Sequence, residues 1–434
     1  MGVRVLQTLR HRLLRLCHHG THPEGQLLLL PGCDRGLRAL NEGHRSTDPG
    51  ARVSRSYLTS AFLSLFVQNF LVFCAFSVFN VIPDHLAALG ASKTYIGLFM
   101  NVNSLVLVLA VVPLSRWSDL IGRKRLMLAG YATALLSAAL SFFFADDLVA
   151  LALLRLLGTV LFCAVFTIQI TEAFGLIPRE RRMSGMAVFG VSGLAANPVA
   201  SFIGERLIEG PGPRWLFAAV FALTLAASLP ALAYRFHEPG GDAERSPFLA
   251  LLGRKELAPL IALAFMLGGA FAVLTTFLAN LTRERLGTVS ISIFFVSFST
   301  VAVFIRLFLG TWIERLSPRI LTASCFALIS AAFLMTFTLT DAALLVPIGV
   351  LYGIGHSVLY PLLSTLFVNS GPDAERLGLN NLYSAANTLG NIVAAVAMGM
   401  IADLFGLPSI FIVMAVLAAA MIPLGLTGLR RRGP

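Results

Sequence analysis

The segment "SRWSDLIGRKR", residues 115–125, places one acid and four bases between two long apolar runs. The chain around it has 434 residues, of which 57% are hydrophobic and only 13% are charged. Its mean hydropathy is +0.81. So few polar side chains cannot cover the surface of a globular protein of this size. The segment is therefore expected to be a short polar loop at a membrane surface, within an integral membrane protein.

Twelve apolar runs are long enough to cross a bilayer as helices. Two of them, 148–174 and 286–313, qualify only if Arg155 and Glu172 in the first and Arg306 in the second are accepted inside a span. The predicted fold is an all-α membrane protein with twelve transmembrane helices. The uncharged runs are 57–81, 94–115, 126–145, 183–204, 215–234, 257–282, 320–340, 342–371, 377–402 and 404–429.

The net charge of +11 has an uneven distribution along the chain. With the amino terminus inside, seventeen Lys and Arg residues fall in the inner loops and carboxyl tail, against five in the outer loops. This is the positive-inside bias of a multi-pass protein of the cell membrane with both termini in the cytoplasm. The basic excess is therefore topological and argues against a nucleic-acid partner. The five cysteines have no metal-ligand or disulfide spacing, and no cofactor or metal is expected.

Residues 1–55 form a basic segment that precedes the first apolar run. Its start, "RVLQTLRHRLLRL", has Leu on one helical face and Arg on the other, a pattern suited to the inner leaflet. The alternatives are a disordered extension or a wrongly assigned start. It is not a signal peptide, because the run "LLLL" at 27–30 is too short for the apolar core of one.

The chain also repeats itself at an offset of about 195 residues, where "SRWSDLIGRKR" aligns with "GTWIERLSPRI" at 310–320. Duplicated halves around a site at the midplane are typical of secondary transporters. We therefore expect two pseudo-symmetric six-helix bundles, 56–236 and 257–429, with a cytoplasmic linker at 237–256 and a basic tail at 430–434. The aligned pairs are Trp117 with Trp312, Asp119 with Glu314, Lys124 with Arg319, Gly158 with Gly353, Arg182 with Arg376, and Asn197 with Asn391.

Over residues 57–429 the sequence resembles the major facilitator superfamily. The signature of that family between spans two and three is matched at Asp119, Gly122, Arg123 and Lys124, but not at Ser115 and Leu120. "RLLG" at 155–158 resembles the fourth-span motif. "GVSGLAANPVAS" at 190–201 resembles the fifth-span motif of the exporters, although Asn197 and Ser201 replace glycines. The motif positions carried over are Gly190, Gly193, Asn197 and Pro198.

The resemblance implies a gate at the inner surface. Asp119 would face the start of span eleven near Arg376 and hold the two halves together, since a helix amino terminus attracts a carboxylate. Glu314, in the second copy beside Arg319, would face the start of span five near Arg182. Gly122 would supply the turn, and Arg123 and Lys124 would keep the loop in the cytoplasm. The alternative is a solvated loop whose charges serve topology alone.

Ionisable side chains within spans are costly, at ~2.5–3.5 kcal/mol each, and so invite a functional interpretation. Arg155 could hold an anionic substrate group, pair with an acid, or clamp backbone carbonyls. Glu172 is either a proton carrier or a solvated helix end, and Arg306 is a clamp or gate. His356 is either a proton carrier or ligand contact, or a His bonded between helices. The other candidates for the substrate or proton pathway are Gln68, Asn69, Gln169, Tyr352 and Tyr360.

The sequence has no Walker phosphate loop and no soluble domain large enough for an ATPase. We therefore predict a secondary active transporter, most simply a proton-coupled exporter of small, partly apolar drugs or metabolites, and not an enzyme. The alternatives are a proton-coupled uptake symporter for a small organic anion and a membrane sensor that reuses the bundle. The expected partners are a small-molecule substrate, protons and the lipid bilayer, with the protein a monomer.

Overall fold

A computed structural model describes residues 59–102, 104, 106, 121–177, 182–234, 251, 253–309, 316–372 and 375–428. The chain divides into two units, 1–56 and 57–434, and all the described residues belong to the second. Below, residues 59–234 are called the first half and residues 251–428 the second half. Asp119, Glu314, the amino-terminal segment, the tail at 430–434 and most of the predicted linker lie outside the described residues.

The first half is helical throughout its described length, apart from short turns. The Thr59 hydroxyl accepts a hydrogen bond from the Phe62 amide and caps the first helix, and the Asp147 carboxylate accepts from the amides of Val149 and Ala150. Such caps satisfy amides that a helix start leaves without partners. The elements are α3 (Ser60–Ser77), η1 (Val78–Val81), α4 (Ile82–Ala88), a helix that includes residues 93–102, α6 (Arg123–Phe143), α7 (Leu148–Leu176), α8 (Arg182–Glu209) and α9 (Arg214–Ala233).

The second half has the same plan, with one irregular turn. Helix α12 passes directly into η4, a π-helical turn, and the two share one predicted span. The elements are η3 (Lys255–Leu257), α11 (Ala258–Leu286), α12 (Ile291–Phe304), η4 (Ile305–Leu309), α14 (Pro318–Phe337), η5 (Ala342–Leu344), α15 (Leu345–Val368), α16 (Arg376–Phe405) and α17 (Ser409–Gly428).

Over their described residues, all twelve predicted spans are largely helical, and nine of the described helices are long and apolar enough to cross a membrane. The all-α fold is thus confirmed, but the predicted end of the first span is wrong. Helicity continues through η1 and α4 to Ala88, seven residues beyond the predicted end at Val81. Pro83 permits this because it sits in the first turn of α4, where a missing N–H breaks no helical hydrogen bond.

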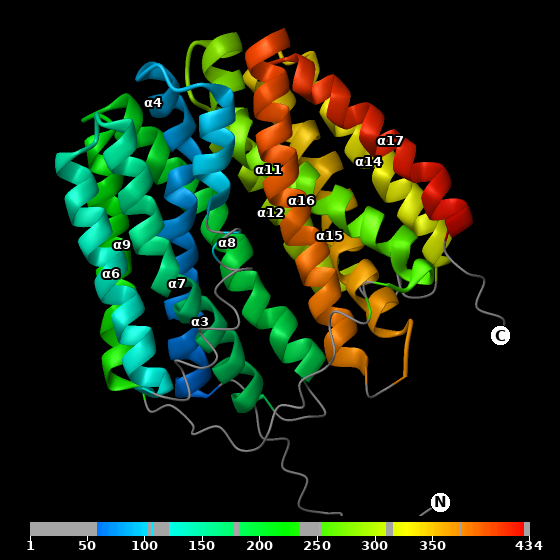
Figure 1. Ribbon diagram of the computed structural model, residues 1–434, viewed down its shortest axis with the longest axis horizontal. Coiled ribbons are helices and arrows are strands. Elements are labelled where there is room, and N and C mark those ends of the chain that lie inside the picture. The colour runs from blue at the N-terminus through cyan, green and yellow to red at the C-terminus, as the bar shows by residue number, and fades with distance from the viewer. Residues whose placement is uncertain are drawn as a thin grey trace, which may run out of the picture. The chain divides into compact units, whose positions relative to one another are not determined.

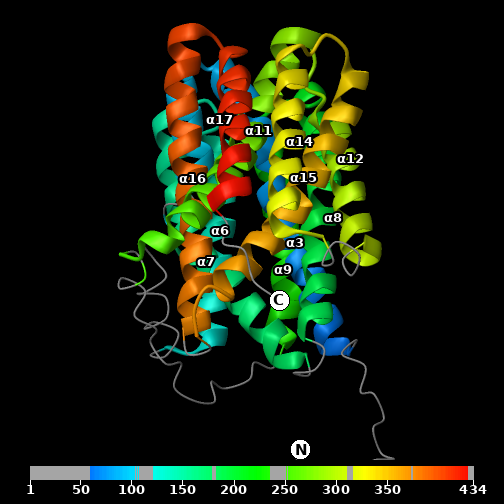
Figure 2. The same ribbon diagram turned by 90° about the vertical axis from the view of Figure 1, so that its right-hand side faces the viewer.

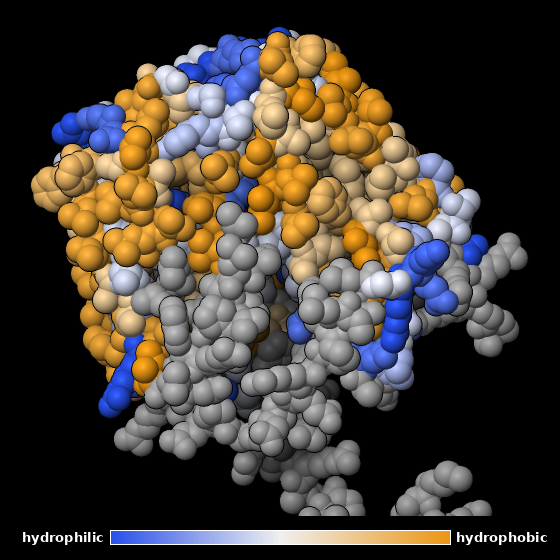
Figure 3. Space-filling model, viewed as in Figure 1, coloured by the Kyte–Doolittle hydropathy of each residue, from blue (hydrophilic) through white to orange (hydrophobic). Residues whose placement is uncertain are grey.

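The helices pack into two groups that meet along a seam (Figures 1 and 2). In the first half, α6 packs against α7 and α9, and α3 against α8 and α9; in the second, α11 packs against α16, and α14 against α15 and α17. Across the seam, α8 packs against α12, and α4 against α11. Apolar side chains cover most of the visible flank, and polar ones lie toward both ends (Figure 3). This apolar flank suits contact with lipid hydrocarbon.

Gly122, within the segment 115–125, has the backbone geometry of a turn, as predicted. Its φ of 84° and ψ of 146° lie in a region that L side chains rarely adopt, and it directly precedes α6. Only glycine adopts this conformation without strain. The predicted role of Gly122 in turning the chain is therefore consistent with the backbone.

Candidate functional site

At one end of the bundle, ion pairs join the two halves. The Arg283 guanidinium at the end of α11 contacts Asp84 of α4, with Nε 3.1 Å from Oδ1, and Glu209 of α8, with Nη2 2.7 Å from Oε1. The two acids belong to the first half and the arginine to the second. A guanidinium can hold two carboxylates at once because its five N–H groups form a planar fork. We call this the latch, and the end of the bundle where it lies the latch end.

Further hydrogen bonds at the latch end also cross the seam. Glu205 of α8 accepts hydrogen bonds from the amide (2.5 Å) and hydroxyl (2.6 Å) of Ser292, in the first turn of α12. Asp403 of α16 accepts from the amides of Lys93 and Thr94, where the second predicted span begins. Each carboxylate lies against the amino terminus of a helix in the other half, where the helix dipole stabilises negative charge. Asn280 adds a bond to the carbonyl of Pro83 at 2.8 Å.

Two glycines let backbones approach closely at the same seam. A Cβ at Gly399 of α16 would lie 2.6 Å from the carbonyl oxygen of Lys93. A Cβ at Gly97 would collide with the carbonyl of Ala395. Small residues are the usual means of close helix packing in membranes. The latch end is therefore closed by both polar bonds and backbone packing.

At the opposite end, called the basic end, the described polar contacts stay within one half. Arg123 of α6 pairs with Glu172 of α7 at 2.9 Å, and the carboxylate side chain is only 1% exposed. Lys124 donates to the carbonyl of Leu232 at the end of α9. Thus Glu172, predicted to be a proton carrier or a solvated helix end, lies in a buried ion pair. Arg123 and Lys124 tie α6 to α7 and α9.

A second ion pair at the basic end lies on the surface of the second half. Both Nη atoms of Arg254 donate to the carboxylate of Glu375 at 2.6 Å. These bonds to the guanidinium hold the pKa of the Glu375 carboxyl below its usual value. The side chains of Arg182 and Arg376, which were predicted to face Glu314 and Asp119, lie outside the described residues. Arg319 is partly exposed at the start of α14.

Between the two ends, His356 of α15 lies in an aromatic cluster. Its ring centroid is 5.1 Å from that of Phe271, 5.8 Å from that of Phe298 and 5.6 Å from that of Tyr352, on which it stacks. Tyr360, one turn further on, is 6.0 Å away and 42% exposed. His356 has no described hydrogen bond, so the alternative of a His bonded between helices finds no support among the described contacts. Tyr352 is fully buried behind it.

Arg306 brings a positive charge next to this cluster. It lies in the π-helical turn η4, close enough to His356, Tyr360 and Tyr383 to act on each electrostatically. Within the described part of the chain, its guanidinium has neither a carboxylate nor a hydrogen-bond acceptor as partner. π-helical turns within α-helices frequently occur at functional sites. We call Arg306, His356, Phe271, Phe298 and Tyr360 the central cluster.

The fifth-span motif forms the wall of the first half opposite Arg306. A Cβ at Gly190 would lie 3.2 Å from Nη1 of Arg306, and one at Gly193 would lie 3.4 Å from the ring of Phe73. Asn197 accepts a hydrogen bond from Ser77 of α3 at 2.8 Å. Pro198 lies inside α8 and lines an apolar groove against α12. Gly190 therefore makes room for a cation of the second half, Gly193 lets the Phe73 ring pack against α8, and Asn197 fixes α8 to α3.

The remaining predicted pathway residues lie inside the first half. Gln68 and Gln169 are fully buried, and their amides donate to Ser64 and Tyr131. Asn69 donates to Ser192 at 2.6 Å. Arg155 lies in a separate cavity in the first half, so the described contacts join none of these four residues to the central cluster.

Sequence reasoning gave Arg283 no role beyond topology, and it overlooked Glu205, Glu209 and Asp403. It did not connect Asp84, at the end of the first span, to a partner. The only signal in the sequence was that these charges lie close to predicted span ends. Asp84 and Arg283 are separated by 199 residues, so their pairing depends on the fold.

The described residues form a helical bundle with an apolar flank and two halves that are joined by polar contacts at one end. A model of the Major Facilitator Superfamily matches residues 65–376 and 260–434. The chain therefore belongs to that family, as the motifs had indicated, and is a multi-pass membrane protein.

Solved structures with this fold agree with the family assignment. The nucleoside transporter NupG matches at a TM-score of 0.72 with 14% identity, over 86% of this chain and 100% of that one. A bacterial homolog of the human lysosomal transporter Spinster, inward-facing and unoccupied, matches at 0.69 with 15% identity, over 86% and 98%. The human organic anion transporter MFSD10 (TETRAN) matches at 0.59 with 18% identity, over 84% and 98%. At such identities these likenesses bear on the fold alone.

Proposed function

We propose that the protein is a secondary active transporter that moves a small, partly apolar organic anion by alternating access. Arg306 carries the proposal. It is a cation within a predicted membrane span, unpaired among the described residues, and it lies against Gly190 of the other half. An uncompensated charge at such depth is costly. An anionic group of the substrate, bound between the halves, would offset that cost.

The remainder of the central cluster suits the apolar part of such a substrate. Phe271 and His356 are partly exposed, and Tyr360 presents a phenol that is 42% exposed. Phe73 and Phe166 form an edge-to-face pair, with centroids 5.5 Å apart, on the opposing half. Aromatic walls with a few polar groups are typical of small-molecule sites. The printed name of MFSD10, an organic anion transporter, supports the same substrate class by analogy.

In the proposed cycle the latch end and the basic end open alternately around the central cluster. The basic end would face the cytoplasm, because most of the predicted loop charges belong to it. Both termini would then be cytoplasmic and the latch would face outward, in the cell membrane. Asp119, with Arg376, remains the proposed partner gate at the basic end.

For direction we retain export driven by inward movement of protons, with His356 as the proposed proton carrier, since a neutral imidazole has a ring nitrogen that can accept a proton. Uptake of the anion together with a proton is the alternative that Arg306 equally favours. In the uptake alternative the proton crosses together with the anion and balances its charge, whereas in export the carrier returns with the proton after the anion has left.

The test is transport in proteoliposomes with an imposed pH gradient, using radiolabelled aromatic and aliphatic carboxylates together with neutral analogues of the same shape. We expect gradient-dependent flux of an anion that Arg306→Gln lowers by about tenfold or more, as for the loss of a charge-assisted hydrogen bond. Arg285→Gln, at an exposed base outside the central cluster, is the matched control. Equal flux of the neutral analogue, or wild-type flux in Arg306→Gln, would remove the basis of the proposal.

A further inference from the structure

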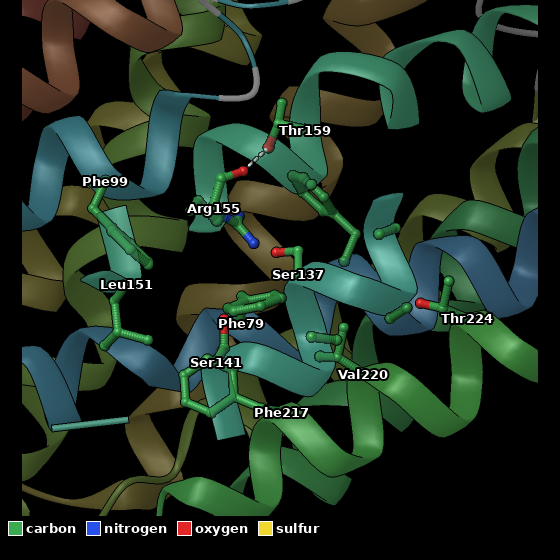
Figure 4. Close-up of a pocket in the computed structure, with 15 residues that line it drawn as sticks. Phe79, Phe99, Ser137, Ser141, Leu151, Arg155, Thr159, Phe217, Val220 and Thr224 are labelled. Carbon is green, nitrogen blue, oxygen red and sulfur yellow. Dashed lines mark hydrogen bonds between the residues drawn. The ribbon is translucent and has the colours of Figure 1, made fainter. Parts of the chain in front are cut away.

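A cavity of about 60 Å³ lies inside the first half, away from the central cluster. It is bounded by α3, α6, α7, α9 and Phe99 (Figure 4). Arg155 of α7 reaches toward Ser137 and Phe79 on its wall. An organic substrate needs a pocket of roughly 300 Å³ or more. This cavity has room for a few water molecules or a small ion.

Arg155 has no polar partner within the described part of the chain. Its Nε is buried without an acceptor, and no ion pair or side-chain hydrogen bond is made by its guanidinium. No carboxylate lies among the residues that line the cavity. Among the described residues, Arg155 therefore neither pairs with an acid nor clamps backbone carbonyls, which are two of the roles that the sequence left open.

Three aromatic rings surround the guanidinium instead. Its Cζ lies 4.0 Å from the ring centroid of Phe79, 5.6 Å from that of Phe99 and 5.8 Å from that of Phe76. Cation–π contacts of this kind contribute ~0.5–2 kcal/mol each. Placing a charge in an apolar interior without a counter-ion costs several kcal/mol. The rings therefore stabilise the cation only in part, and no described residue supplies a counter-charge.

The polar atoms of the cavity can complete an anion site. Ser141 and Thr224 line it with hydroxyl groups that have no described hydrogen bond, and hydroxyls can donate to an anion. Phenylalanine ring edges carry partial positive charge and also tolerate an anion beside them. We propose that this cavity binds a small monovalent anion on Arg155, either a free halide or the carboxylate of a very small acid. The bound anion neutralises the cation and so stabilises the first half.

The experiment is thermal unfolding of the purified full-length protein in detergent, at constant ionic strength, in sodium gluconate with increasing chloride, bromide or formate. A ligand that binds only the folded state raises the midpoint temperature in a saturable way. We expect this rise for wild type and at least a roughly tenfold weaker anion dependence for Arg155→Gln. Arg206→Gln is the control, because Arg206 also stacks on a ring, Phe202 at 5.2 Å, but does not line the cavity.

The arms of the experiment identify the source of the anion. A rise with chloride and bromide alone assigns the site to a free halide, and a rise with formate alone assigns it to an organic acid. If Arg155→Gln does not fold, Thr224→Val and Ser141→Ala remove the hydroxyls and are expected to weaken the anion dependence. Identical unfolding in every salt, or an anion dependence unchanged in the cavity variants, overturns the proposal.

Discussion

The two ends of the helical bundle use the same kinds of polar contact in different ways. At the latch end, Asp84, Glu209 and Arg283 join the first half to the second. At the basic end, the described pairs Arg123 with Glu172 and Arg254 with Glu375 each remain within one half. Contacts within a half persist when the halves rotate apart, whereas contacts across the seam must break. The comparison indicates which polar groups hold each bundle together and which ones gate the seam.

The largest effect on stability is expected from Glu172→Gln at the basic end. This change breaks the ion pair with the partly buried Arg123, and breaking a buried pair costs about 3 kcal/mol or more. Because both residues belong to the first half, we expect loss of thermal stability in detergent without a change in which end is open. The double variant Arg123→Gln with Glu172→Gln should recover part of the loss. No loss in the single variant would show that the pair does not stabilise the first half.

Gly399→Ala at the latch end is expected to lower stability less, but to change how often that end opens. The added methyl group would lie 2.6 Å from the Lys93 carbonyl, and overpacking of this kind costs ~1–3 kcal/mol. The closed latch end should therefore open more often. The measurement is the rate at which a membrane-impermeant thiol reagent labels Thr276→Cys in a background without native cysteines. Thr276 is a buried position at the seam, and its hydroxyl accepts a hydrogen bond from Asn101.

The control for Gly399→Ala is Gly175→Ala in α7, where an added Cβ would meet nothing within 4 Å. Labelling of Thr276→Cys should rise several-fold with Gly399→Ala and remain at the wild-type rate with Gly175→Ala. Equal labelling in both backgrounds would mean that close packing of Gly399 does not hold the latch end shut.

The smallest effect is expected from the exposed pair of Arg254 and Glu375. Since Arg254 lowers the pKa of Glu375, the contribution of this pair to stability is fully present above the unfolded-state pKa of about 4.5. It disappears as pH falls through the lower pKa of the folded state. Exposed pairs contribute little, so Arg254→Gln should unfold like wild type at pH 7. A large loss of stability in Arg254→Gln at pH 7, or a deficit that persists at a pH below the pKa of Glu375, would contradict this assignment.

Much of the fold could be predicted from the sequence, because span length and loop charge are local properties. The twelve runs, the repeat of 115–125 at 310–320 and the turn at Gly122 needed no partner elsewhere in the chain. Pairings across the fold could not be predicted. Arg283 was indistinguishable from a topological base, and Glu172 from a solvated helix end, until the helices were packed. The π-helical turn that presents Arg306 also has no signature in the local sequence, although the residue itself attracted attention as a charge within a span.

The measurement that tests the central claim most directly is a pair of spin-label distances in the Arg283→Gln variant, in membranes and without native cysteines. One pair, at Asp146 and Thr338, spans the seam at the latch end, and the other, at Ile121 and Ser317, spans it at the basic end; all four positions are exposed. Alternating access predicts that loss of the latch lengthens the first distance and shortens the second. A longer distance at the latch end with no change at the basic end, or no change at either end, would contradict the account.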